Sequence, residues 1–368
     1  MKRLLSFILA WAMSISAGEY EPMTSAKEAL HALLHKKEIL SERYAGQVSE
    51  EVWDESPFSW DDTVLLTKQP DRDFVILNLS DIHFADYDYR TVLAFASMRT
   101  AHRLVETVRP DLITISGDLV CSKSTVYSIR RLTDFMESLG VPWAPVFGNH
   151  DDEGNCDLNF LADTMLKSPH CLLRKGDPDM GVGNYILRIA EKDGETLRTV
   201  QTLFMLDSHH DTVNERQQAW YNRAADGIRT LTDGEAAIAA LMHIPLPEYQ
   251  YAYDEAVRNG TLQGELHETI CCARADGVPV QNGFFDILRQ THTTHVLCGH
   301  DHMNNFSVVY KGIRLTYMMK LGKGSGFQVG FDGGTVIRVG HGGIREIEHL
   351  TRSFGGFKTL LKTEENKS

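Results

Sequence analysis

The sequence predicts an α/β fold in which two β-sheets pack against each other. Between residues 72 and 151, apolar runs alternate with segments of helical periodicity, which is typical of a layered domain with parallel strands. Further along the chain, strands follow one another with little helix between them, which predicts a second sheet with antiparallel pairing. The chain has 368 residues, 42% of them hydrophobic, and is long enough to bury a large core.

The elements follow in order along the chain. Buried strands are predicted at 74–81, 111–118 and 141–151, and helices at 90–108 and 124–140. The later strands are predicted at 184–191, 199–207, 308–319 and 335–340. Because no linker composition occurs between residues 72 and 350, we expect a single domain over 72–350, followed by a C-terminal tail at 351–368.

The first 71 residues precede this domain. Lys2 and Arg3 come before an apolar stretch at 4–15 and small residues at 16–18, which is the order found in a secretory signal. This pattern predicts a signal peptide over 1–18 and a secreted or extracytoplasmic protein. The alternative is a cytoplasmic protein whose N-terminal helix packs on the domain. Residues 23–44 have the periodicity of an amphipathic helix, so 19–71 is expected to be a helical extension.

Charge and cysteine content restrict the function classes. A formal net charge of −13 argues against a surface that binds nucleic acid through its phosphates. No apolar run reaches the roughly 18–20 residues of a transmembrane segment. Among the six cysteines, Cys156 and Cys171 could pair across a loop in an oxidising compartment, and buried free thiols are the alternative.

Polar side chains of the kinds that bind metals follow five strand-like runs. In open α/β sheets, ligands bind beyond the carboxyl ends of the strands, where several loops converge. Five strand ends can therefore supply one site with imidazole nitrogens and with carboxylate and amide oxygens, which suit divalent cations. The residues are Asp81, His83, Asp118, Asn149, His150, Asp151, His243, His300 and His302.

Each motif alone has a structural alternative. Gly117-Asp118 is also a common turn, in which the glycine supplies a positive φ and the aspartate caps a helix. His243 lies in an apolar stretch, where a hydrogen-bonded core histidine is the commoner case, and residues 299–302 could form a polar turn. The order of all five motifs and their shared position at strand ends favour a metal site.

Taken in order, Asp81-x-His83, Gly117-Asp118, Gly148-Asn149-His150-Asp151, His243 and Gly299-His300-Asp301-His302 resemble the signature of the calcineurin-like metallophosphoesterase superfamily. The resemblance covers about residues 72–345. Segments 242–249, 268–272 and 299–306 are similar to the branch that contains fungal and plant purple-acid-phosphatase-like proteins. The resemblance implies a two-sheet β-sandwich flanked by helices, in α-β-β-α layers.

The resemblance also implies two divalent metal ions, such as Mn, Fe or Zn. One ion would be held by Asp81, His83, Asp118 and His302, and the other by Asp118, Asn149, His243 and His300, so that Asp118 bridges them. His150 would act as a general acid or hydrogen-bond donor in the transition state, oriented by Asp151. Asp301 is a candidate partner for a ligand imidazole.

The implied reaction is hydrolysis of phosphate monoesters by a hydroxide that bridges the two metals. The acidic chain disfavours long polyanions, so the expected substrates are phosphorylated small molecules or phosphoproteins. One alternative is a phosphodiesterase that uses the same metal centre. Another is a pseudoenzyme that binds metal or a phosphorylated ligand without turnover.

The sequence also departs from the purple acid phosphatases. Those enzymes place a tyrosine ligand three residues after the aspartate of the Gly-Asp motif, where this chain has Cys121. We therefore expect no tyrosinate-to-iron charge transfer and no purple colour. His209 or His210, in a polar segment at 206–211, is a candidate substrate contact, with a solvated turn as the alternative. Loops 152–182 and 210–235 are expected to select the substrate.

Overall fold

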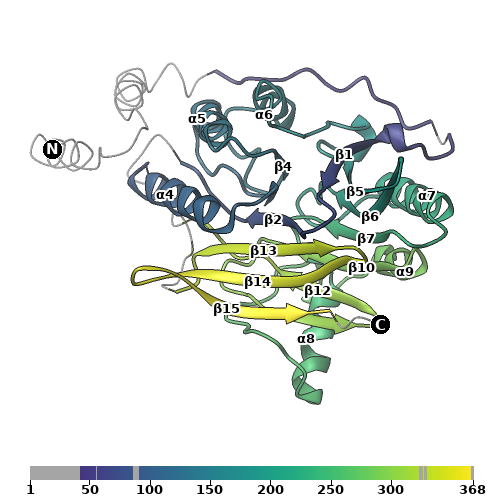
Figure 1. Ribbon diagram of the computed structural model, residues 1–368. Coiled ribbons are helices and arrows are strands. Elements are labelled where there is room, and N and C mark those ends of the chain that lie inside the picture. The colour runs from purple at the N-terminus through teal and green to yellow at the C-terminus, as the bar shows by residue number, and fades with distance from the viewer. Residues whose placement is uncertain (1–41, 55, 86–90, 323–325, 327–329, 366–368) are drawn as a thin grey trace, which may run out of the picture.

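The computed structural model in Figure 1 describes residues 42–365, apart from 55, 86–90, 323–325 and 327–329. The segment predicted as a signal peptide lies outside the described residues. So does the helix predicted at 23–44, except for its last three residues. Within the described part, the chain forms two large sheets with helices on both sides.

The first sheet has six strands in the order β15-β14-β13-β2-β3-β4. Parallel pairing joins β2 (Phe74–Leu79), β3 (Leu112–Ser116) and β4 (Trp143–Val146), connected by helices α4 (Thr91–Val108) and α5 (Thr125–Ser138). This confirms the alternating strands and helices predicted at the start of the domain. The short helix α6 (Leu158–Met165) follows β4 and is N-capped by the side chain of Asp157.

The second sheet has seven strands in the order β1-β5-β6-β7-β10-β12-β11. They are β1 (Thr63–Lys68), β5 (Tyr185–Asp193), β6 (Thr196–Met205), β7 (Ala237–Leu241), β10 (Thr293–Cys298), β11 (Ser307–Tyr310) and β12 (Ile313–Tyr317). The expected antiparallel pairing occurs in the hairpins β5–β6 and β11–β12. The prediction was wrong for β6–β7, β7–β10 and β10–β12, which pair in parallel.

The parallel pairs are possible because helices connect the strands. Helix α7 (Glu215–Leu231) joins β6 to β7, and α8 (Glu248–Asn259) and α9 (Phe284–Gln290) lie between β7 and β10. Helix α7 occupies most of segment 210–235, which the sequence predicts to be a loop, so that prediction is wrong. Its start has a local signal, a capping box in which the side chains of Asn214 and Gln217 each accept a hydrogen bond from the other residue's backbone N–H.

The layers follow the predicted α-β-β-α order. Along β7, Ala239 and Leu241 pack in the core cluster that includes the first sheet, while Ile238 and Ala240 pack in the cluster that includes α7, α8 and α9. This alternation is the two-residue period of a strand that is buried on both faces. Figure 1 shows α4, α5 and α6 beside the first sheet and α7 and α9 beside the second.

Both predicted domain boundaries were wrong. β13 (Gly333–Gly340), β14 (Gly343–Ser353) and β15 (Gly356–Glu364) form an antiparallel extension of the first sheet, so the predicted tail at 351–368 is largely a hairpin strand. At the other end, β1 pairs with β5 and belongs to the domain. Apart from β1, the described part of the predicted helical extension contains a 3-10 turn, η1 (Trp60–Asp62), and chain without regular secondary structure.

The remaining elements are a 3-10 turn, η2 (Pro178–Met180), and a small hairpin of β8 (Arg274–Ala275) and β9 (Val278–Pro279). Cys156 and Cys171, the candidate disulfide pair, are both thiols in the structure. Burial raises the pKa of Cys156 to about 11 and that of Cys171 to about 12. The structure therefore has free thiols at both positions, with Cys156 buried and Cys171 half-buried.

Candidate metal centre

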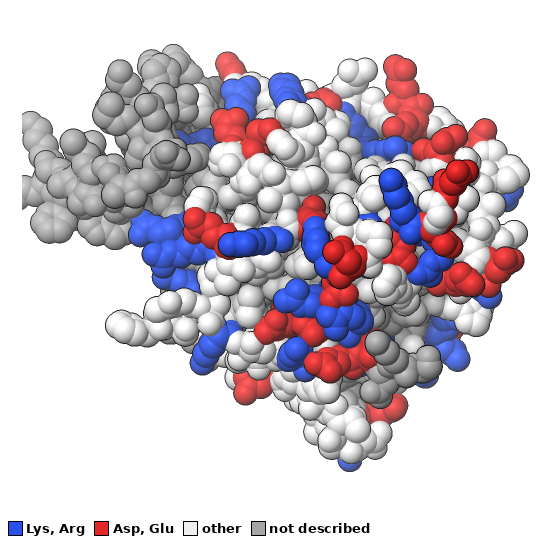
Figure 2. Space-filling model, viewed as in Figure 1, with Lys and Arg blue, Asp and Glu red and all other residues white. Residues whose placement is uncertain are grey.

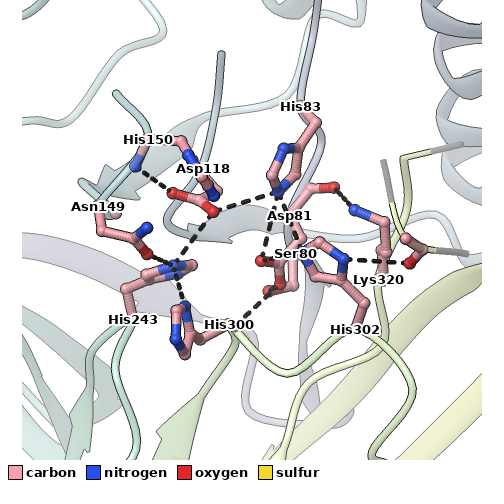
Figure 3. A network of polar contacts seen from close by, with 12 residues as sticks. Ser80, Asp81, His83, Asp118, Asn149, His150, His243, His300, His302 and Lys320 are labelled. Atoms are coloured by element: carbon pink, nitrogen blue, oxygen red, sulfur yellow. Dashed lines mark hydrogen bonds and ion pairs between the residues drawn. The ribbon is translucent and has the colours of Figure 1, made fainter. Parts of the chain in front are cut away.

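The five strand ends predicted to converge do so in the structure. Figure 3 shows the side chains of the seven candidate ligands pointing toward one another from loops that follow β2, β3, β4, β7 and β10. β2, β3 and β4 belong to one sheet and β7 and β10 to the other, so both sheets contribute to the site. The ligand set divides into two groups that share one residue.

The first group consists of Asp81, His83, Asp118 and His302, whose ligand atoms all lie within 4.8 Å of one another. Nε2 of His83 lies 3.1 Å from Oδ2 of Asp118 and 3.1 Å from Nε2 of His302. Nε2 of His302 lies 3.4 Å from Oδ1 of Asp81. Two imidazole nitrogens and two carboxylates therefore face one small volume.

The second group consists of Asp118, His243 and His300, again within 4.8 Å of one another. Nε2 of His243 lies 3.3 Å from Oδ2 of Asp118 and 3.3 Å from Nδ1 of His300. Oδ1 of Asn149 lies 3.1 Å from the same nitrogen of His243, so the amide oxygen joins this group. Asp118 is common to both groups, as expected of a residue that bridges two ions.

The donor set fits two divalent cations. Among the described residues, Oδ1 of Asp81 and Oδ2 of Asp118 are buried without a hydrogen-bond partner. A buried polar atom that faces imidazole nitrogens without a hydrogen bond to them is consistent with a cation between the two. A cation in each group would satisfy these oxygens together with the imidazole nitrogens that face them, and nitrogen and oxygen donors suit ions such as Mn²⁺, Fe²⁺ and Zn²⁺.

The carboxyl and imidazole groups of the site shift one another's pKa values. Burial opposes ionisation of Asp81 and Asp118, but the neighbouring histidines outweigh it and hold the pKa of both carboxyls well below its usual range. Burial also opposes protonation of His83 and His243, yet Asp118 and Asp81 raise the pKa of His83 to about 10 and that of His243 to about 9. Burial and the charge of His243 lower the pKa of His300 to about 4, so this imidazole is neutral at pH 7.

The backbone around the ligands is held in rare conformations. Asp81, His83, Asp118 and His300 have φ values of 50°, 47°, 52° and 75°, in the left-handed region that residues other than glycine seldom adopt. Such strain clusters at functional sites because the surrounding structure must impose it. Close packing adds a second constraint, because a Cβ atom on Gly148 would overlap Oδ1 of Asp118.

His150 lies beside the first group, as predicted, but a different carboxylate orients it. Both carboxylate oxygens of Asp151 accept hydrogen bonds from backbone N–H groups, those of Val120 and Gly148. Asp151 therefore holds the loop rather than the imidazole, which corrects its predicted role. Oε2 of Glu153 lies 2.9 Å from Nδ1 of His150, and no motif in the sequence marks this glutamate.

The second nitrogens of two ligand histidines are fixed by backbone carbonyls. Nδ1 of His243 donates to the carbonyl of Ser116 at 2.8 Å, and Nδ1 of His302 lies 3.1 Å from the carbonyl of Gly326. Such partners set the tautomer and direct Nε2 into the site. Asp301 accepts a 2.5 Å hydrogen bond from the Tyr317 hydroxyl and has an oxygen within 4.8 Å of a His300 nitrogen, so its role as an imidazole partner stays a prediction.

A buried lysine supports the first group through the backbone of one of its ligands. Lys320 is 2% exposed and donates to the backbone carbonyl of Asp81 at 2.9 Å, as Figure 3 shows. Burial lowers the pKa of its ammonium to about 8. The hydroxyl of Ser80 donates to Oδ2 of Asp81 at 2.5 Å and fixes the carboxylate. Neither residue has a sequence signal, because their roles depend on the tertiary fold.

The two further histidines of the 206–211 segment differ. His209 has φ of 50° and its Nδ1 lies 3.4 Å from the buried carboxylate of Asp207, so it forms part of a structured turn. His210 is largely exposed, and its Nε2 lies 3.4 Å from Oδ2 of Asp152, in the loop that carries Asn149 and His150. Of the two candidate substrate contacts, His210 is therefore the one at the rim of the site.

Comparison with known proteins agrees with this geometry. A family model described as calcineurin-like phosphoesterase matches residues 74–304. The chain therefore belongs to the calcineurin-like phosphoesterase family, as the motifs predicted. A solved structure of a dimetal phosphatase from Danio rerio shares the fold, with a TM-score of 0.51 and 12% identity over 79% of this chain and 99% of its own.

Two relatives illustrate the branch. "Probable inactive purple acid phosphatase 14" of Arabidopsis thaliana is 26% identical over 71% of this chain and 73% of its own length. "Phosphatase DCR2" of Saccharomyces cerevisiae is 26% identical over 63% of this chain and 44% of its own length. These similarities confirm the predicted likeness to purple-acid-phosphatase-like proteins of plants and fungi. Among the described residues, no helix is long and apolar enough to cross a bilayer.

Proposed function

We propose that this chain is a phosphatase that hydrolyses phosphate monoesters with two divalent metal ions. The observation that carries the proposal is the position of Asp118, whose Oδ2 faces His83 at 3.1 Å and His243 at 3.3 Å and so belongs to both ligand groups. When bound, two ions would supply Lewis acidity, which activates water at neutral pH and neutralises charge on the phosphoryl oxygens.

The protein's own residues would then perform two tasks. Asn149, His243 and His300 face one side of Asp118 and the first group faces the other, so the ligands define where the phosphoryl group can sit. His150 lies at the edge of this arrangement, 5.2 Å from His83 between ring centroids. It can donate a proton to the leaving oxygen, a contribution typically of about 10²–10⁴ in rate.

Glu153 supports this assignment of His150. The carboxylate of Glu153 lies beside Nδ1 and orients the ring, so that Nε2 can face the leaving oxygen. With Nδ1 facing Glu153, we assign proton donation to Nε2. Glu153→Gln should therefore reduce turnover less than His150→Ala, because the ring remains while its orienting charge is lost.

The net charge of −13 favours monoesters over long polyanionic diesters. Figure 2 shows acidic and basic side chains interspersed over the face that carries β13, β14 and β15. Several of the basic groups are paired, including Arg338 and Lys362 with Glu346, and Arg345 with Asp73. A nucleic-acid surface would instead need a continuous basic stripe to neutralise phosphates.

The names of the plant relatives make an inactive metal-binding protein the second candidate. The candidate ligand set supports activity, because the seven side chains lie close together and His150 lies beside them. Assays with an aryl phosphate monoester and the matching diester, on protein supplied with Mn, Fe or Zn, distinguish the candidates.

We expect the monoester to be preferred by at least about tenfold in kcat/KM, which requires about 1.4 kcal/mol of differential transition-state binding. A reversed ratio would identify a phosphodiesterase. Bound metal with no turnover of either ester would identify a pseudoenzyme.

A further inference from the structure

A second cluster of metal-binding side chains lies beside the dinuclear site. Cys121, His150 and Glu153 bring one sulfur, one nitrogen and one oxygen ligand atom within 4.8 Å of one another. Cys121 belongs to the loop after β3, and His150 and Glu153 belong to the loop after β4. None of the seven ligands of the dinuclear site is a member of this cluster.

We propose that this cluster is a third, regulatory cation site that binds a thiophilic divalent ion such as Zn²⁺ and inhibits the phosphatase. The donor chemistry distinguishes it from the inner sites. The inner sites offer only nitrogen and oxygen, whereas a thiolate, an imidazole and a carboxylate together select Zn²⁺ or Cd²⁺ over Mn²⁺ and Mg²⁺.

Geometry and charge both favour binding. His150 and Glu153 are already preorganised, with Nδ1 of His150 lying 2.9 Å from Oε2 of Glu153. The thiolate of Cys121 and the carboxylate of Glu153 together balance the charge of a divalent ion. A third ion can therefore bind close to the dinuclear centre without adding net positive charge there, which keeps repulsion between the ions small.

The position also explains the expected inhibition. An ion held by the His150 nitrogen that faces Glu153 would tie the imidazole to the outer cluster. The ring that we assign to the leaving group would then no longer be free to serve it. The side chain of Cys121 also contacts His83, a candidate ligand of the first ion, so the outer ion lies next to the catalytic centre.

Titration with Cd²⁺ tests this site directly, because thiolate coordination gives an ultraviolet charge-transfer band that nitrogen and oxygen ligands do not give. We expect the band to appear in protein whose inner sites are already filled, with one additional equivalent of Cd²⁺ bound. Cys121→Ser should abolish the band and weaken binding of the additional equivalent at least about tenfold. Glu153→Gln should weaken binding while the band remains.

The matched control is Cys271→Ser. Cys271 is more exposed and lies in a rival cluster with His300 and Asp301. We expect this variant to keep the band and the affinity of wild type. The proposal would be overturned if Cys271→Ser abolished the band. It would also be overturned if Cys121→Ser bound the additional Cd²⁺ as tightly as wild type.

The existence of the outer cation site does not depend on the proposed function. Only the inhibition of hydrolysis rests on it. Zn²⁺ at concentrations that fill the outer site should slow hydrolysis of an aryl phosphate by wild type and leave Cys121→Ser unaffected. If neither protein hydrolysed phosphate esters, the proposed function would fail while the charge-transfer band still decided whether the site exists. If both were inhibited equally, the regulatory role would be refuted.

Discussion

His83 and His243 face the same oxygen atom, Oδ2 of Asp118, from opposite ligand groups at 3.1 and 3.3 Å. His83 follows β2 of the first sheet and His243 follows β7 of the second, and the two residues are 160 positions apart in the chain. Asp118 therefore links the two sheets through the site, and loss of its charge should affect both groups at once.

Asp118→Asn and His150→Ala should have different effects. The first removes the shared negative charge, so we expect lower occupancy of both ions, measured by elemental analysis. The second leaves the seven ligands in place, so metal content should stay at the wild-type level while kcat falls by about 10²–10⁴. An equal loss of metal in the two variants would contradict the assignment of His150.

Metal affinity should rise with pH. The carboxylates of Asp118 and Asp81 raise the pKa of His83 to about 10 and that of His243 to about 9 in the protein without metal. Metal must displace those protons, so protons compete most strongly below these values and the apparent affinity increases until the pH passes about 9 to 10.

Calorimetric titration of chelator-treated protein in buffers of different ionisation enthalpy measures the protons released. We expect at least one proton released per chain at pH 7. Binding without proton release, or an affinity that falls between pH 6 and 8, would contradict the protonation states assigned to these histidines.

Lys320 should act on the metal site through Asp81. Lys320→Met removes a hydrogen bond from a charged donor, an interaction worth about 1.5–3 kcal/mol, and frees a backbone carbonyl next to a strained ligand. We expect metal affinity to fall by roughly 10- to 100-fold, as for other groups that position ligands.

Lys68→Met is the matched control, because Lys68 is equally buried but pairs with Glu191 at 2.8 Å on strand β5. This variant should lower the melting temperature while keeping metal affinity. The positioning role of Lys320 would be refuted if both variants lost stability and neither lost metal affinity.

Gly148→Ala should disrupt the same centre by steric overlap. The added Cβ meets the side chain of Asp118 and the imidazole of His243, which are both packed and cannot move freely. We expect loss of bound metal and reduced thermal stability. Gly342→Ala is the control, because a Cβ there meets no atom within 4 Å and the change should leave metal content unaltered.

The candidate ligands could be predicted from sequence because each follows a recognisable buried strand. The carboxyl ends of strands in an α/β sheet meet at one edge of the sheet. Asp, His and Asn at those positions therefore predict a metal site from the sequence alone. Glu153 and Lys320 could not be found in this way. Glu153 resembles any surface carboxylate, and Lys320 reaches Asp81 only because residues 320–322 run beside 80–82.

The errors in the fold have similar physical causes. Helix α7 has a weak apolar periodicity, because one of its buried residues is polar and two are small: they are Gln217, Tyr221, Ala224, Ala225 and Ile228. The pairing of β13 with β2 joins residues about 260 positions apart, as in Ile337 opposite Ile76, and no local pattern specifies that partner. The hairpin strand β15 is an edge strand with many exposed residues, so it resembled a tail.

The most direct test of the central claim is the metal content of the purified, metal-replete chain. In protein supplied with Mn²⁺, which the thiolate-containing outer cluster does not select, we expect two divalent ions per chain by elemental analysis after unbound metal is removed, because Asp118 completes two ligand groups. A content of zero or one ion per chain, unchanged after Mn, Fe or Zn is supplied, would contradict the dinuclear centre and the function proposed from it.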